Sequence, residues 1–308
     1  MQSVPLEDSY ALSANALVIA EPGANARDAG EALALAGIRA AGVASFAEAP
    51  QRLGAHVTVD LILIEAAGAP DALIDAVLAR ADATARERGA AVVAAIAADQ
   101  IDMAAAHLLG SNCQLLCAPT MAERIAALAV AKGRIGKRLH DASRDAETQR
   151  LQRLNEEVAR IADTLARLTR GEEEERRVRA PGQDYRGPND GERTANAQEI
   201  RAAIRSRRLR AQFFAGELFA DPAWDMLLDL FAAELEQRRV SVSSLCIAAA
   251  VPPTTALRWI GTLHDAGLFE RHADPADRRR AYIGLSAKGQ EGMRNYVAAV
   301  KRQGLSIA

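Results

Sequence analysis

Residues 241–285 read SVSSLCIAAAVPPTTALRWIGTLHDAGLFERHADPADRRRAYIGL, and they carry the most informative pattern in the chain. The first ten residues are mostly apolar with serines at the start, which predicts a short helix. The break Val251-Pro252-Pro253 separates this segment from a longer predicted helix, Thr254–Ala266, which ends at Gly267. A helix, a tight turn and a second helix form a helix-turn-helix unit.

The second predicted helix has an apolar face and a polar face. With 100° per residue counted from Thr254, the apolar arc spans about 180° to 280°. It holds Ala256, Ile260, Leu263 and His264. The polar arc spans about 0° to 100° and is expected to face outward, with the width that a groove-reading helix needs. It holds Thr254, Thr255, Arg258 and Thr262.

A β-hairpin is predicted after this helix pair. Two short predicted strands, 268–272 and 281–285, flank a turn that contains Asp-Pro and three consecutive arginines. A last helix is expected over about 287–302, with Ser286 as its N-cap. Upstream, helices are expected over 198–219 and from Asp221, an N-cap that is followed by proline.

These segments, over roughly 198–302, resemble the winged helix-turn-helix of the MarR family of bacterial transcriptional regulators. The most specific part is Gly-Leu-Phe-x-Arg, followed by Asp-Pro-x-Asp-Arg-Arg and by a Leu-Ser-x-x-Gly step. The resemblance implies binding as a dimer, with the second helix in the major groove and a wing arginine in the neighbouring minor groove. It implies base contacts for Thr254, Thr255 and Arg258, minor-groove insertion for Arg278 or Arg279, and an orienting role for Asp277.

The chemistry of these residues agrees with such roles. Arg258 is suited to pair bidentately with guanine, and threonines such as Thr262 donate, accept or touch a thymine methyl group. Ser243 and Ser244 are suited to phosphate contacts near a helix start. The run Arg278–Arg280 suits a narrow minor groove. A solvated charge run is the alternative for these arginines, and a solvated helix face is the alternative for Arg201, Arg205, Arg207, Arg208 and Arg210.

The first 130 residues alternate short apolar runs with helix-like segments. Five runs are expected to be strands, because their nearly continuous hydrophobicity suits burial on both faces of a sheet. They are Ala16–Glu21, Ile38–Ala44, Val59–Glu65, Ala90–Ile96 and Cys113–Ala118. Helices are expected between them at 25–36, 46–53, 71–88, 101–110 and 120–131. This alternation predicts a doubly wound parallel α/β domain.

The α/β region, over roughly 14–131, resembles the receiver domains of response regulators. Residues 59–65, VDLILIE, are similar to the third receiver strand, which ends in a phosphorylated Asp where this chain has Glu65. The family also uses an acidic pair after strand one, a hydroxyl after strand four, and a lysine before a proline after strand five. The chain keeps Glu21 and Pro119 but has Ala118 at the lysine position. Without that charge compensation, we expect a degenerate receiver-like domain that is not phosphorylated and serves signalling or assembly. Another small α/β domain with the same strand pattern is the alternative.

A leucine-rich seam follows, with apolar residues spaced by three and four over about two and a half heptads. It consists of Leu151, Leu154, Val158, Ile161, Leu165 and Leu168. This pattern predicts a coiled coil that pairs two copies of the chain; a helix packed against its own domain is the alternative. Residues 171–196 are rich in glycine and charge and are expected to be a flexible linker. The predicted division is therefore 1–133, 134–170, 171–196 and 197–308.

Composition limits the class of protein. The 308 residues carry a net charge of −2, but the charge is unevenly distributed along the chain. Residues 1–130 contain 7 basic and 15 acidic residues, whereas residues 201–308 contain 16 basic and 11 acidic residues. A basic C-terminal region suits a polyanionic partner. No secretory signal, membrane span or metal-ligand spacing is visible, and the three cysteines form no disulfide framework. A cytoplasmic protein without a cofactor or an enzymatic motif is expected.

Together these patterns predict a homodimeric regulator that binds double-stranded DNA and has a possible signalling protein as a further partner. Two other functions stay open. The winged helix would bind protein in an interaction scaffold, or the α/β domain would hold a small molecule at the carboxyl ends of its strands.

Overall fold

The computed structural model describes residues 14–54, 59–135, 196–213, 220–274, 276–277 and 279–307. The predicted coiled-coil seam lies outside the described residues. So does the predicted linker, apart from Asn196. Both remain predictions.

The N-terminal domain contains a parallel five-stranded sheet, as predicted. Its order is β2-β1-β3-β4-β5, and every neighbouring pair is parallel. The strands are β1 (Asn15–Ala20), β2 (Arg39–Ala44), β3 (Leu61–Glu65), β4 (Ala91–Ile96) and β5 (Cys113–Cys117). All residues of β3 and β4 are buried, which explains their uninterrupted hydrophobicity, whereas the edge strand β2 is largely exposed.

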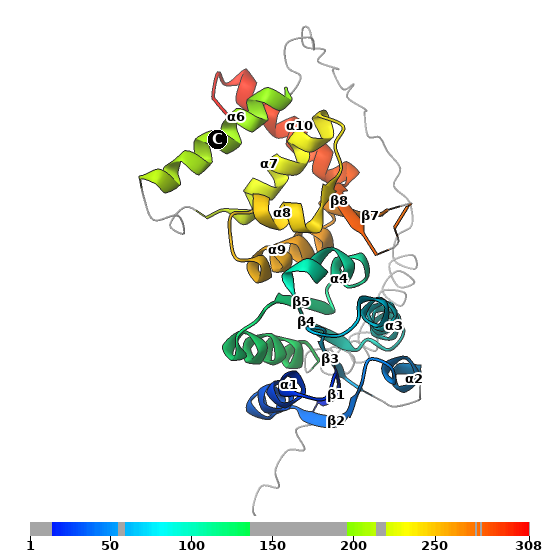
Figure 1. Ribbon diagram of the computed structural model, residues 1–308. Helices are drawn as coiled ribbons and strands as arrows, with labels where there is room; N and C mark the ends of the chain where they lie inside the picture. The colour runs from blue at the N-terminus through cyan, green and yellow to red at the C-terminus, as the bar shows by residue number, and fades with distance from the viewer. Residues whose placement is uncertain are drawn as a thin grey trace, which may run out of the picture. The chain divides into compact units, whose positions relative to one another are not determined.

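Helices cover both faces of this sheet. Figure 1 shows α1 and the helix at 121–135 on one face, with α2 and α3 on the other. The bounds are α1 (Ala24–Leu35), α2 (Ala49–Gly54), α3 (Asp71–Arg88) and α4 (Ile101–His107). Helix α2 begins three residues later than predicted, and α4 ends three residues earlier. The doubly wound α/β architecture is therefore confirmed at the level of its elements.

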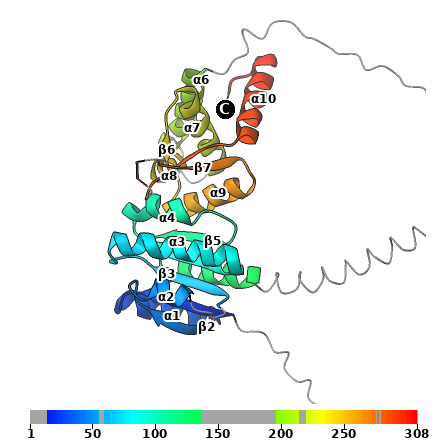
Figure 2. The ribbon, with the colours of Figure 1, turned by 90° about the vertical axis from the view of Figure 1, so that its right-hand side faces the viewer.

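The C-terminal domain is built from helices and one small antiparallel sheet of order β6-β8-β7. Its elements are α6 (Ala197–Leu209), α7 (Pro222–Leu235), β6 (Val240–Ser241), α8 (Val242–Ala248), α9 (Pro253–Asp265), β7 (Phe269–Ala273), β8 (Ala281–Leu285) and α10 (Ala287–Arg302). Figure 2 shows the helices α6, α7, α8, α9 and α10 of this domain. The helix pair, the hairpin and the last helix agree with the predictions. Strand β6, with two residues, is too short to leave a periodic signal.

One predicted helix is too long. The sequence pattern predicts a helix over 198–219, but α6 ends at Leu209 and a 3-10 turn, Arg210–Gln212, follows. Phe213 is 72% exposed. Since Phe214 and Leu218 lie outside the described residues, the described chain gives no continuous apolar face beyond Leu209.

Side-chain caps begin several of these helices. The Asp221 carboxylate accepts a hydrogen bond from the Trp224 N–H at α7, and the Ser286 hydroxyl accepts from the Gly289 N–H at α10, both at predicted N-caps. Ser241 caps α8 in the same way through the Ser244 N–H. These bonds satisfy N–H groups that have no partner inside the helix.

The two folded domains belong to one unit defined by contacts, Met1–Gly133 with Arg193–Ala308. Among the described helices, none is both long enough and apolar enough to cross a membrane.

Candidate nucleic-acid interface

Helix α9 presents the polar face that the sequence predicts. Ala256, Leu257, Ile260 and Leu263 are buried, so the apolar side of the helix faces the domain core. On the other side Arg258 and Thr262 are exposed, and Thr255 is half-buried. The Thr262 hydroxyl donates to the Arg258 carbonyl at 2.9 Å, within the helix. The Arg258 guanidinium is therefore accessible at the centre of this face.

The first turn of α9 has a different environment. The Thr254 hydroxyl accepts a hydrogen bond from the Cys117 N–H at 3.0 Å and donates to the Cys117 carbonyl at 3.3 Å. Cys117 ends β5, which forms the edge of the α/β sheet opposite to β2. The outward-facing arc that we predicted for α9 is thus divided, because Thr254 contacts the α/β domain of the same chain while Arg258 and Thr262 stay exposed.

The start of α8 also contacts the α/β domain. The Asp102 carboxylate, in the first turn of α4, accepts from the Ser243 N–H at 2.8 Å and from the Ser243 hydroxyl at 2.7 Å. Ser244 is exposed, and its hydroxyl bonds to that of Ser241 at 2.9 Å. Of the two predicted phosphate contacts, only Ser244 faces solvent.

A third contact of this kind has no local signal in the sequence. Arg271 of β7 donates from Nη1 to the carbonyls of Ala106 and Ala105, at 2.5 and 3.4 Å, near the end of α4. Those carbonyls lie in the last turn of a helix, where no further turn supplies N–H partners. Burial lowers the pKa of Arg271. The family motif contains this arginine, but nothing in its spacing indicates a partner more than 160 residues away.

In the wing, an acidic residue organises the turn before β8. The Asp277 carboxylate accepts from the Arg279 N–H at 3.0 Å and lies 3.7 Å from the Arg280 guanidinium. Arg279 and Arg280 are exposed, and Arg278 lies outside the described residues. Asp277 therefore contacts both described arginines of the run, one through its backbone and one through its side chain.

A second wing aspartate was missed by the sequence reasoning. Asp274 accepts from the Ala276 N–H at 2.9 Å and from the Tyr282 hydroxyl at 3.0 Å. These hydrogen bonds lower the pKa of Asp274, the bond from Ala276 most of all. The Arg239 guanidinium lies 5.5 Å from the centre of the Tyr282 ring. An Asp followed by Pro is a turn signal that could have identified this residue.

Two arginines of α6 pair with acidic residues of α7 and of its C-cap. Arg201 binds Asp229 and Glu236, and Arg207 binds Asp225. Both guanidinium groups are thus engaged inside the C-terminal domain, which favours a structural role for them over phosphate contacts.

The predicted receiver-like residues do not form a cluster of free carboxylates. Glu65 is 2% exposed and bonds to Arg124. The carbonyl of Pro119 accepts from the same arginine at 2.8 Å, and Glu21 accepts from the Phe46 N–H at 3.2 Å. Ala118 has a positive φ of 44°. Within the described residues, no group of acidic, histidine or cysteine side chains is arranged to hold a metal ion.

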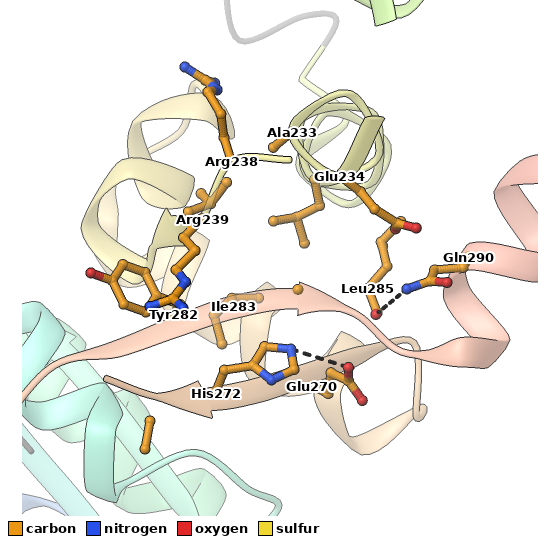
Figure 3. Close-up of a pocket in the computed structure, with 14 residues that line it drawn as sticks. Ala233, Glu234, Arg238, Arg239, Glu270, His272, Tyr282, Ile283, Leu285 and Gln290 are labelled. Atoms are coloured by element: carbon orange, nitrogen blue, oxygen red, sulfur yellow. Dashed lines mark hydrogen bonds and ion pairs between the residues drawn. The ribbon is translucent and has the colours of Figure 1, made fainter. Parts of the chain in front are cut away.

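A cavity of about 440 Å³ lies between α7, the small sheet and α10 (Figure 3). Charged and aromatic side chains line it, among them Glu234, Arg239, Glu270, His272 and Tyr282. Glu234 Oε1 accepts from Arg294 at 3.3 Å, whereas Oε2 is buried without a hydrogen-bond partner among the described residues. Burial raises the pKa of Glu234. Residues of the C-terminal domain line this cavity. The small-molecule alternative instead places a ligand at the carboxyl ends of the strands of the α/β domain.

A model of a known protein family matches part of the C-terminal domain. Residues 226–289 match the family model of the winged helix DNA-binding domain. Similar solved structures include S. aureus MepR in complex with DNA, at 17% identity over 35% of this chain and 81% of that chain, with a TM-score of 0.25. Tm0710 from Thermotoga maritima is 20% identical over 35% of this chain and 70% of that chain, with a TM-score of 0.23. MarR is 23% identical over 34% of this chain and 74% of that chain, also with a TM-score of 0.23. A search of curated proteins gives no match. On the basis of the family model, the C-terminal domain is a winged helix DNA-binding domain.

Proposed function

We propose that this protein is a transcriptional regulator that binds double-stranded DNA in a sequence-specific way. Helix α9 would enter the major groove and the wing would reach the adjacent minor groove. The observation that carries the proposal is the exposed polar face of α9, with Arg258 at its centre, in the same domain as the exposed Arg279 and Arg280. Arginine at such positions reads guanine in the major groove and narrow A·T-rich minor grooves.

A gel-shift assay with genomic fragments tests this proposal. Arg258→Ala and Arg279→Ala should each weaken retention of a selected fragment by about 1–3 kcal/mol, the usual contribution of one specific base contact. Arg52→Ala is the matched control, because Arg52 is an exposed arginine of α2 in the other domain. Equal retention by all four proteins would instead favour an interaction scaffold in which the winged helix binds protein.

We further propose that the regulator acts as a homodimer that pairs through the seam from Leu151 to Leu168. A dimer would place two copies of α9 about one DNA turn apart, so the preferred sites would be pseudo-palindromes. Light scattering on the full chain measures the mass directly. Leu154→Lys and Ile161→Lys should give a monomer if the seam pairs two chains, and an unchanged mass would contradict this part of the proposal.

The α/β domain would act as a receiver-like signalling or assembly domain without phosphoryl transfer, with a protein as its possible partner. Its support is the strand order β2-β1-β3-β4-β5 and the pairing of Glu65 with Arg124 at the end of β3. The proposed role involves no enzymatic activity and no cofactor, and we place the protein in the cytoplasm.

Small-molecule sensing is a second candidate, and one observation favours it. The cavity beside α7 has a volume typical of small-ligand sites and contains Oε2 of Glu234, for which the described part of the chain supplies no hydrogen-bond partner. A ligand with a hydrogen-bond donor would satisfy that atom. Thermal-shift screening with metabolites, repeated on Glu234→Gln, would identify such a ligand by a shift that the variant loses.

A further inference from the structure

We propose that the α/β domain binds the DNA-reading face of the winged helix and competes with DNA for it. This inference rests on the proposed function, because it describes the regulation of the same surface. The docked arrangement is the one in the structure, and DNA would select an arrangement in which the two domains have separated.

DNA and the α/β domain would compete because both need the same polar groups of the winged helix. A Ser243 phosphate contact needs the N–H and hydroxyl donors that the Asp102 carboxylate already accepts. A carboxylate and a phosphate both present anionic oxygens to such donors, so Asp102 stands where a backbone phosphate would be held. Thr254, the first residue of the predicted base-reading arc, has its hydroxyl engaged on both sides by Cys117. Neither side chain can serve DNA while docked.

Thr254 fits its partner because of the position of Cys117. The Ala118 N–H donates to Ile96 of β4, so the N–H and carbonyl of Cys117 point to the other side of β5, where the sheet has no further strand. Unpaired groups on an edge strand need partners or water. One threonine hydroxyl satisfies both, and α9 contacts β5 over more than this residue.

Apolar burial and a charged contact accompany these hydrogen bonds. Trp259 of α9 and Met103, Leu109 and Cys113 of the α/β domain are partly buried against one hydrophobic cluster, which contains residues of both domains. Arg271 adds a cation at the end of α4 through the carbonyls of Ala105 and Ala106. Three elements of the C-terminal domain, α8, α9 and β7, therefore each make a polar contact to the α/β domain, which is more than a single chance hydrogen bond provides.

Part of the DNA-reading face stays accessible in the docked form. Arg258, Thr262 and the wing residues Arg279 and Arg280 are exposed. These residues allow a first encounter with DNA, whereas full entry of α9 into a groove needs release of its first turn. The apparent Kd for DNA is then the intrinsic Kd divided by the fraction of undocked molecules.

Two substitutions in the full chain test the competition. Asp102→Ala and Arg271→Ala each remove one docking contact and no residue of the proposed DNA-reading set. Both should tighten binding to a genomic fragment by roughly tenfold, a change of about 1.4 kcal/mol. For Arg271→Ala this prediction is the opposite of simple electrostatics, since loss of a positive charge would otherwise weaken binding to a polyanion. Asp99→Ala is the control, because it removes an exposed acid near Asp102 and should leave affinity nearly unchanged.

A second readout follows docking without DNA. Cys246 lies three residues after Ser243 on the same face of α8 and is buried, and burial raises its pKa to about 12, with the nearby Asp102 and Cys117 contributing. Undocking removes these neighbours. Alkylation of Cys246, located by peptide mass mapping, should therefore be faster in Asp102→Ala than in wild type or Asp99→Ala, and DNA should accelerate it in wild type.

The outcomes separate the two proposals. Tighter DNA binding together with faster alkylation in Asp102→Ala and Arg271→Ala supports competition. Unchanged affinity in correctly folded variants that still bind DNA overturns the competition and leaves the proposed function in place. If no variant binds DNA, the proposed function is overturned, and the competition with DNA is overturned with it. Faster alkylation in Asp102→Ala would then still show that the two domains dock on each other.

Discussion

Arg124 donates from Nε and Nη2 to the two carboxylate oxygens of Glu65, at 3.0 and 3.1 Å. Glu65 is 2% exposed and ends β3, while Arg124 lies on the helix at 121–135. Burial raises the pKa of Glu65 even though Arg124 opposes this effect, and the hydrogen bond to Glu65 raises the pKa of Arg124. The pair ties the last helix of the α/β domain to the centre of its sheet.

Arg124→Leu should destabilise the α/β domain by about 3–5 kcal/mol, because it leaves a buried carboxylate without its partner. The double variant Arg124→Leu with Glu65→Leu should recover most of that loss, since it removes both charges together. Urea unfolding of the full chain, followed by circular dichroism, measures both. A double variant as unstable as the single one would contradict the assignment of the loss to an unpaired Glu65.

The pH dependence of stability carries the same signature. Because the pKa of Glu65 is raised in the folded state, the folded chain holds this proton more tightly than the unfolded chain does. That contribution is complete below the unfolded value of 4.5 and is lost as pH rises through the folded pKa. The free energy of unfolding of Glu65→Gln should therefore increase relative to wild type as pH rises from acid to neutral. Urea unfolding midpoints of both proteins, measured across that pH range, test this prediction. It is wrong if the difference between Glu65→Gln and wild type stays constant or falls as pH rises.

The pairing also bears on phosphoryl transfer. Both oxygens of Glu65 are occupied by Arg124, and residues 97 and 98, after β4, are alanines without a hydroxyl. A phosphoryl group at this strand end would lack the lysine and hydroxyl that compensate its charge. Incubation with acetyl phosphate and Mg²⁺ should give no adduct of about 80 Da in the intact mass, the increment of one phosphoryl group. A phosphorylatable receiver domain treated in parallel is the positive control, and a Mg²⁺-dependent adduct on this chain would disprove the prediction.

The sequence allowed the elements to be predicted, because their signals are local. The strands of the α/β sheet lie within two residues of the predicted runs, since buried parallel strands are continuously apolar. Helix α9 shows its buried side at Ala256, Ile260 and Leu263, as the periodicity required.

Contacts between distant segments could not be predicted in the same way. Thr254 was assigned to a solvent-facing arc because helical periodicity describes a helix by itself. Its partner, Cys117, is 137 residues away, and the edge of β5 that it covers exists only once the strand order is known. Arg124 was also missed, because an arginine at the start of a helix looks like any solvated charge until the helix packs over Glu65. A single sequence holds no local signal for such pairs.

The Leu-Ser-x-x-Gly step has a steric reason, which gives a last prediction. A Cβ at Gly289, in the first turn of α10, would lie 2.4 Å from the carbonyl oxygen of Leu268, and this carbonyl is held by the Ser286 N–H at 2.9 Å. Backbone cannot move aside as a side-chain end can, so Gly289→Ala should destabilise the C-terminal domain by about 1–3 kcal/mol or more. Gly292→Ala is the matched control one turn later, because nothing lies within 4 Å of its Cβ and alanine stabilises a helix interior by about 1 kcal/mol over glycine. The midpoint of thermal unfolding should therefore fall for Gly289→Ala and rise for Gly292→Ala. A lower midpoint for both would contradict the explanation, because the loss would then come from any substitution in α10 and not from the contact with Leu268.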